Sequence, residues 1–116
     1  MGGNKNNRAF GWYVSSIAGK IWLESTYEFK VASELDRNGI RWLRPKGIKY
    51  QIDGVERTYF ADFYLIDFDT FLDPKNDYLI EKDDNKIMNV QKQKLIKILI
   101  LDKYCLTWEC IKARLT

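Results

Sequence analysis

The sequence contains no histidine. This absence excludes Ser-His-Asp and Cys-His catalysis, and it excludes metal centres that depend on imidazole ligands. The only two cysteines, Cys105 and Cys110, have a spacing that fits neither a CxxC redox pair nor half of a zinc site. We therefore expect reduced, partly buried thiols.

Long apolar runs are also missing. No stretch of about 18 apolar residues is present to span a membrane. The first residues carry no apolar signal segment, which predicts a cytoplasmic protein. A length of 116 residues with 46% hydrophobic and 15% aromatic content predicts one globular domain over residues 1–116. Residues 1–10, rich in Gly and Asn, are expected to form a flexible basic arm.

Acidic residues are scarce at the start of the chain, where none precedes Glu24. Residues 1–50 hold nine Lys or Arg against four Asp or Glu, whereas residues 51–116 hold ten against twelve. A basic half beside an acidic cluster suits a polyanionic substrate. Ordinary surface charge is the alternative explanation.

Periodicity and turn signals predict an α/β fold with a mixed central sheet flanked by helices. Ser25 and Glu28 form a capping box that begins a helix ending near Asn38 before Gly39, with Val31, Ala32 and Leu35 buried. Asp53-Gly54 predicts a hairpin between strands 48–52 and 55–59. Further strands are expected at 40–43, 60–68, 70–75 and 95–101, and helices at 81–93 and 107–115. The segment 12–23 is too apolar for a tail and is expected to pack or to contact a partner.

The most informative feature is a pair of acids eleven residues apart on neighbouring strands. Asp62 interrupts an aromatic strand, and Asp73 precedes Pro74 and Lys75 in the returning strand. Because side chains alternate along a strand, Lys75 shares a face with Asp73. Glu28 lies on the buried side of the first helix and faces the sheet. These residue types suit hydrolysis of a phosphodiester, since carboxylates bind Mg²⁺ and a lysine orients or deprotonates the attacking water.

Each residue also has a simpler explanation. Glu28 can serve only as the capping partner of Ser25, Asp62 can be a surface turn acid, Asp73 can end a strand, and Lys75 can be solvated. Their joint occurrence in this order favours a shared site, because converging carboxylates repel one another without a cation or a proton.

The order Glu28, Asp62, Asp73-Pro74-Lys75 resembles the signature of the PD-(D/E)XK nuclease superfamily. Ala61 stands where that superfamily has proline, which is not a ligand. Over most of residues 11–101, segments such as 25–32 and 59–65 resemble small bacteriophage homing endonucleases, and the phage junction-resolving endonucleases have a similar layout. The resemblance implies a restriction-endonuclease-like fold, cleavage of double-stranded DNA with Mg²⁺ (Mn²⁺ substituting) to leave 5′-phosphate ends, and the Pro74 carbonyl as a further metal ligand. It also implies the cytoplasm of a bacterial host if the protein is phage-encoded.

Basic residues of the first half are candidates for contacts with DNA phosphates, which position a protein without reading sequence. They are Lys5, Arg8, Lys20, Arg41, Arg44, Lys46 and Lys49. Trp12, Tyr13 and Trp22 can stack on bases or pack against the core or a second subunit. One catalytic centre cuts one strand, so double-strand cleavage favours a homodimer or a higher oligomer.

Three functions remain open from the sequence. The first is a DNA endonuclease of homing type. The second is a structure-selective nuclease acting on junctions or mismatches, and the third is an inactive DNA-binding module.

Overall fold

The computed structural model describes residues 11–115, apart from the side chains of residues 77, 81 and 82. The elements follow in the order β1 (Gly11–Ser15), β2 (Gly19–Leu23), α1 (Thr26–Arg37), β3 (Trp42–Leu43), β4 (Ile48–Ile52), β5 (Val55–Tyr59), β6 (Phe63–Leu65), β7 (Thr70–Pro74), α2 (Asp77–Lys94), β8 (Lys97–Leu101) and α3 (Trp108–Arg114). No helix within this part of the chain is long and apolar enough to cross a membrane. The expected basic arm, residues 1–10, lies outside the described residues.

A mixed four-stranded sheet with the order β3-β6-β7-β8 forms the centre of the fold. β3, β6 and β7 pair antiparallel, whereas β7 and β8 run parallel. Parallel neighbours need a crossover connection, and α2 supplies it. The predicted α/β fold with a mixed sheet and flanking helices is confirmed.

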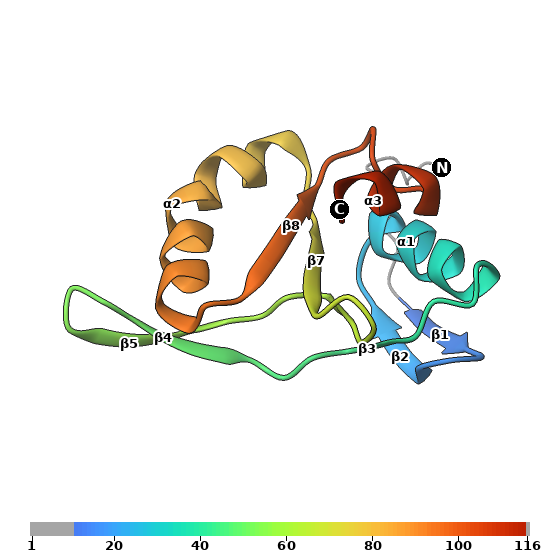
Figure 1. The fold of residues 1–116 in the computed structure, drawn as a ribbon, viewed down its shortest axis with the longest axis horizontal. Helices are drawn as coiled ribbons and strands as arrows, with labels where there is room; N and C mark the ends of the chain where they lie inside the picture. The colour runs from blue at the N-terminus through green and yellow to red at the C-terminus, as the bar shows by residue number, and fades with distance from the viewer. Residues whose placement is uncertain (1–10, 116) are drawn as a thin grey trace.

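Two hydrophobic clusters cover the two faces of this sheet. Helices α1 and α3 pack on one face against Phe63, Leu72 and Leu101. Helix α2 covers the other face through Ile87 and Val90. Figure 1 shows α1 and α3 together on one side of β7 and β8 and α2 on the opposite side, with the β4–β5 hairpin running past α2. The sheet therefore separates two layers of helices.

Several local predictions are confirmed in detail. Ser25 caps α1 by accepting a hydrogen bond from the Glu28 N–H at 3.1 Å. Gly39 follows the helix with φ +67°, the left-handed conformation that glycine adopts most readily. Asp53 and Gly54 both have positive φ, as a two-residue type I′ hairpin requires.

The β1–β2 hairpin was not predicted, because the segment 12–23 was expected only to pack or to contact a partner. Its inner face places Tyr13 and Ser15 against α1, where both hydroxyls donate to Asp36 at 2.6 and 2.7 Å. Its outer face exposes Trp12 and Trp22, whose rings meet edge to face. Residues of the inner and outer faces alternate along the chain, and this alternation is the sequence signal for a strand.

Several predicted boundaries were wrong. The strand predicted at 60–68 is ordered as a strand only over Phe63–Leu65, because a turn begins at Ile66. Helix α2 starts four residues earlier than predicted, since Asn76 caps it by accepting from the Leu79 N–H at 2.9 Å. Leu95 is not part of a buried strand: it takes a left-handed conformation that ends α2 and is 90% exposed.

The prediction of reduced thiols was also wrong. Cys105 and Cys110 form a disulfide, with their Cα atoms 5.3 Å apart. A turn after β8 and the first turn of α3, capped by Thr107, bring the two residues together. That separation lies within the range that a disulfide spans without backbone movement.

Candidate active site

Glu28 lies in the first turn of α1, where the capping interaction fixes its backbone. Its carboxylate accepts from the Glu24 N–H at 3.3 Å and lies 3.5 Å from the Ser25 hydroxyl. The side chain is only 13% exposed and lines a cavity. Glu28 therefore contacts the capping residue Ser25 and also lines the cavity.

Asp62 and Asp73 face each other across two antiparallel strands. Phe63 pairs with Leu72, and the Asp62 N–H donates to the Leu72 carbonyl at 3.2 Å. Continuing this register sets Asp62 opposite Asp73, and alternation turns both carboxylates to the same face. The predicted convergence of the two acids is confirmed, because both line the same cavity.

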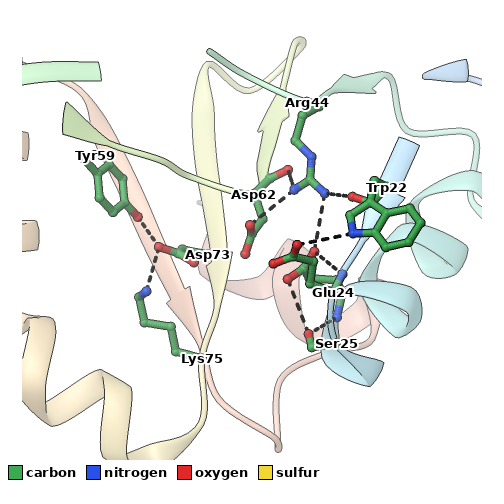
Figure 2. A network of polar contacts seen from close by, with 9 residues as sticks. Trp22, Glu24, Ser25, Arg44, Tyr59, Asp62, Asp73 and Lys75 are labelled. Atoms are coloured by element: carbon green, nitrogen blue, oxygen red, sulfur yellow. Dashed lines mark hydrogen bonds and ion pairs between the residues drawn. The ribbon is translucent and has the colours of Figure 1, made fainter. Parts of the chain in front are cut away.

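Lys75 follows β7 and is held by its backbone N–H, which donates to the Leu101 carbonyl at 2.9 Å. Its ammonium lies 3.3 Å from an Asp73 carboxylate oxygen and 3.3 Å from Asp83 on α2. Tyr59, at the end of β5, donates its hydroxyl to the same Asp73 oxygen. Figure 2 shows Asp73 between Tyr59 and Lys75. Asp73 is 2% exposed, so these partners compensate a buried charge.

Arg44 occupies the other side of the site. Its guanidinium donates to the Asp62 carbonyl at 3.0 Å and to the Asp62 carboxylate at 3.2 Å. It also donates to the Trp22 carbonyl (Figure 2). A further hydrogen bond reaches the Glu28 carboxylate at 3.4 Å. One side chain thus joins β2, α1 and the segment before β6.

Some of these side chains line a cavity of about 480 Å³. Glu28, Asp62, Asp73 and Lys75 all line it, so the structure brings together the four predicted catalytic residues. The other lining residues are Glu24, Ser25, Tyr27, Phe60, Pro74, Asn76 and Leu79.

The electrostatics of the cavity are dominated by its acids. Burial raises the pKa of Asp62 to about 8, and the negative charges of Asp73 and Glu28 add to this effect against the opposing charge of Arg44. Burial alone would lower the pKa of the Lys75 ammonium, but its interactions with Asp73 and Asp83 raise it overall. Perturbed groups that converge in a cavity are typical of functional sites.

Two residues of the site were missed in the sequence, and one was given another role. Tyr59 and Asp83 were not predicted, although Tyr59 ends a strand that leads directly to Asp62. Arg44 was predicted only as a contact to DNA phosphates. The sequence signal for Arg44 is weak, because an arginine before a proline says nothing about partners 16 to 22 residues away.

The other predicted DNA contacts do not gather at the cavity. Lys20 lies over the Trp12 ring at 4.8 Å, Arg41 pairs with Asp67, Lys49 lies 4.0 Å from Glu56, and Lys46 is exposed. Lys5 and Arg8 lie outside the described residues.

The acids of the cavity fit a hard divalent cation by their donor chemistry. Carboxylate oxygens are the ligands that Mg²⁺ prefers. Burial raises the pKa of Asp62 and the charges of Asp73 and Glu28 add to it, and a bound cation would relieve the charge repulsion. In the part of the chain that the structure describes, no three Asp, Glu or Cys side chains stand as a ready metal-binding group. Lys75 contacts Asp73 instead, and Arg44 contacts Asp62 and Glu28.

Comparison of the chain with protein-family models, with curated proteins and with solved structures finds no match.

Proposed function

We propose that this protein is a Mg²⁺-dependent DNA endonuclease of the PD-(D/E)XK type, acting on double-stranded DNA in the manner of a phage homing endonuclease. The observation that carries the proposal is the shared cavity of Glu28, Asp62, Asp73 and Lys75, which come from a helix and two paired strands. Three acids and a lysine suit phosphoryl chemistry better than a merely structural role, because their burial together is costly.

In the proposed reaction a water oxygen attacks the phosphorus and the bond from phosphorus to the 3′-oxygen breaks. The products carry a 5′-phosphate and a 3′-hydroxyl. Mg²⁺, held by Asp62 and Asp73 with help from Glu28 and the Pro74 carbonyl, would supply charge neutralisation of the phosphoryl group. Mn²⁺ would substitute for it.

Lys75, as an ammonium, orients the attacking water and stabilises the negative charge on the phosphoryl oxygens, while the proton of the water leaves to solvent. Asp83 and Asp73 fix the ammonium between them at 3.3 Å each, so the lysine is held at one side of the cavity. Its position two residues after Asp73 sets it next to the proposed metal ligands.

The described basic residues proposed to meet the DNA backbone are Lys20, Arg41, Arg44, Lys46 and Lys49. Double-strand cleavage would follow from a two-fold homodimer with one such cavity in each subunit. The proposed compartment is the cytoplasm, that of a bacterial host if the gene belongs to a phage.

The proposal is tested by incubating the protein with supercoiled plasmid and with four-way junction DNA, in Mg²⁺ and in EDTA. The test variants are Lys75→Ala and Asp62→Asn, and the matched controls are Lys94→Ala and Asp67→Asn, two exposed residues outside the cavity. We expect metal-dependent cleavage that the controls keep and the test variants lose by about 10³-fold. Preference for the junction would identify a structure-selective nuclease. DNA binding without cleavage by the wild type would leave an inactive binding module.

A further inference from the structure

Arg44 is fixed by contacts that do not depend on the acids. Two of its hydrogen bonds go to backbone carbonyls, those of Trp22 and Asp62. Backbone acceptors set the plane and direction of the guanidinium, because its donors form a rigid fork. The same fork then reaches Asp62 and Glu28, at 3.2 and 3.4 Å.

The charge that Arg44 supplies is permanent. A guanidinium is not deprotonated in proteins, so it can leave the two carboxylates only by moving. Asp62 needs this cation, since its other charged neighbours in the cavity, Asp73 and Glu28, are both acidic. Lys75 does not relieve it, because the ammonium lies between Asp73 and Asp83.

A divalent cation and Arg44 therefore compete for the same oxygens. A metal held by Asp62 and Glu28 needs lone pairs that now accept from the guanidinium, and two cations beside one carboxylate repel each other. The side chain has room to move, since Arg44, Trp22, Glu28 and Asp62 line a second cavity of about 300 Å³.

We propose that Arg44 is a built-in competitor of the metal, which occupies the carboxyl oxygens of Asp62 and Glu28 in the metal-free protein and releases at least one of them when a divalent cation binds. This inference rests on the proposed function, because it concerns the same site. It assigns Arg44 a regulatory role: the residue sets the metal concentration at which the site fills. Once released, the guanidinium lies beside the cavity with donors available to a phosphate oxygen.

The inference predicts opposite effects of Arg44 on metal affinity and on metal-free stability. In Arg44→Gln, the dissociation constant for Mg²⁺ or Mn²⁺ should fall on the order of tenfold, as expected from the loss of two partly exposed ion pairs. The melting temperature without metal should fall as well, because Asp62 and Glu28 lose their cation. Added Mg²⁺ should raise the melting temperature of the variant more than that of the wild type.

The experiment is isothermal titration calorimetry of the full chain with Mg²⁺ or Mn²⁺ at fixed ionic strength and without DNA, supported by thermal unfolding. Arg41→Gln is the matched control, because it removes the same charge from an arginine that pairs with Asp67 on the surface. Its metal affinity should stay within about twofold of the wild type. Arg44→Lys retains the charge without the fork and should have an intermediate affinity. If Arg44→Gln does not fold, Arg44→Lys decides the question by the same shift in affinity.

Unchanged or weaker metal binding by Arg44→Gln, beside normal binding by the wild type, would overturn the inference and leave the nuclease proposal standing. Arg44 would then orient the carboxylates for the metal rather than compete with it. Absence of metal binding in the wild type and in every variant would overturn both the inference and the metal-dependent function.

Discussion

The two sides of the candidate site differ in the partners that surround their aspartate. On the lysine side, which comprises Tyr59, Asp73, Lys75 and Asp83, a deeply buried acid has a hydroxyl donor and an ammonium. On the arginine side, which comprises Glu28, Asp62 and Arg44, two acids share one guanidinium that is anchored to the backbone. Lys86 also lies 3.6 Å from Asp83. The lysine side therefore has two cations for its two acids, whereas the arginine side has one cation for two acids and retains excess negative charge.

The difference between the two sides indicates which aspartate stabilises the fold and which one destabilises it unless a cation is bound. A buried acid with two partners contributes to the fold, because removing it leaves the partners unpaired. A buried acid whose neighbours are mainly acidic costs folding free energy that a bound cation can recover. Two aspartates on facing strand positions are thus expected to respond in opposite directions to the same substitution.

The largest effect on stability is expected for Asp73→Asn. The change removes a buried charge from Lys75 and weakens the acceptor of Tyr59, so the free energy of unfolding should fall by about 2–3 kcal/mol. Urea unfolding near pH 6 measures this cost cleanly. Asp62 is then mostly protonated, since its pKa is raised to about 8, and repulsion between the two aspartates contributes little.

Asp67→Asn is the control for this substitution, because Asp67 is half exposed and pairs with Arg41 on the surface. Its effect on unfolding should be much smaller than that of Asp73→Asn. Equal effects of the two substitutions would show that the Tyr59–Asp73–Lys75 cluster adds nothing to the stability of the fold.

Asp62→Asn is expected to stabilise the metal-free protein. The pKa of Asp62 is higher in the folded state than in the unfolded chain, so the folded state holds a proton that the unfolded state releases. The contribution of Asp62 therefore lowers wild-type stability as the pH rises from about 4 to about 8. The variant lacks this loss and should gain on the order of 2 kcal/mol at pH 8 and nothing near pH 4.

Chemical unfolding in EDTA at several pH values measures this gain. A variant that is less stable than the wild type at pH 8 would show that the ion pair with Arg44 outweighs the burial and repulsion of Asp62. The two sides of the site would then be alike in their response.

Asp83→Asn probes how the lysine side positions its ammonium. Asp83 helps to raise the pKa of Lys75 against the effect of burial, so its removal should lower that pKa. We expect cleavage to fall about tenfold, as is usual when a residue that orients a catalytic group is lost. The limb of the pH–rate profile that reports Lys75 should also move to lower pH.

Asp84→Asn is the matched control, because Asp84 is the next residue of α2 and is exposed. It should leave both the rate and the profile unchanged. A rate loss in Asp83→Asn without movement of the profile would mean that Asp83 supports α2 rather than Lys75.

The sequence predicted the parts of this site that local rules control. Alternation along one strand places Lys75 beside Asp73, the return of the chain places Asp62 opposite them, and a capping box orients Glu28. Each of these relations spans a few residues or one pair of neighbouring strands. The mixed sheet with flanking helices followed from the same periodicities.

The remaining parts depend on tertiary contacts that no local pattern encodes. Arg44 reaches a carbonyl 22 residues away, and Asp83 meets Lys75 from α2. The disulfide depends on a turn after β8 and the first turn of α3, which bring the two Cα atoms to 5.3 Å. The spacing of the two cysteines in the sequence does not predict this geometry.

The smallest effect is expected for Tyr59→Phe, which sharpens the description of the lysine side. Burial and the charge of Asp73 raise the pKa of Tyr59, so its hydroxyl remains a donor throughout the accessible pH range. Loss of this donor leaves Asp73 with Lys75 and should lower the free energy of unfolding by about 1 kcal/mol in urea titrations. Tyr64→Phe is the control, because its hydroxyl donates to the exposed Asp69 and should matter less. If Tyr59→Phe costs as much as Asp73→Asn, the hydroxyl rather than the ammonium is the partner that compensates the buried charge, and the lysine is then free to act on the attacking water.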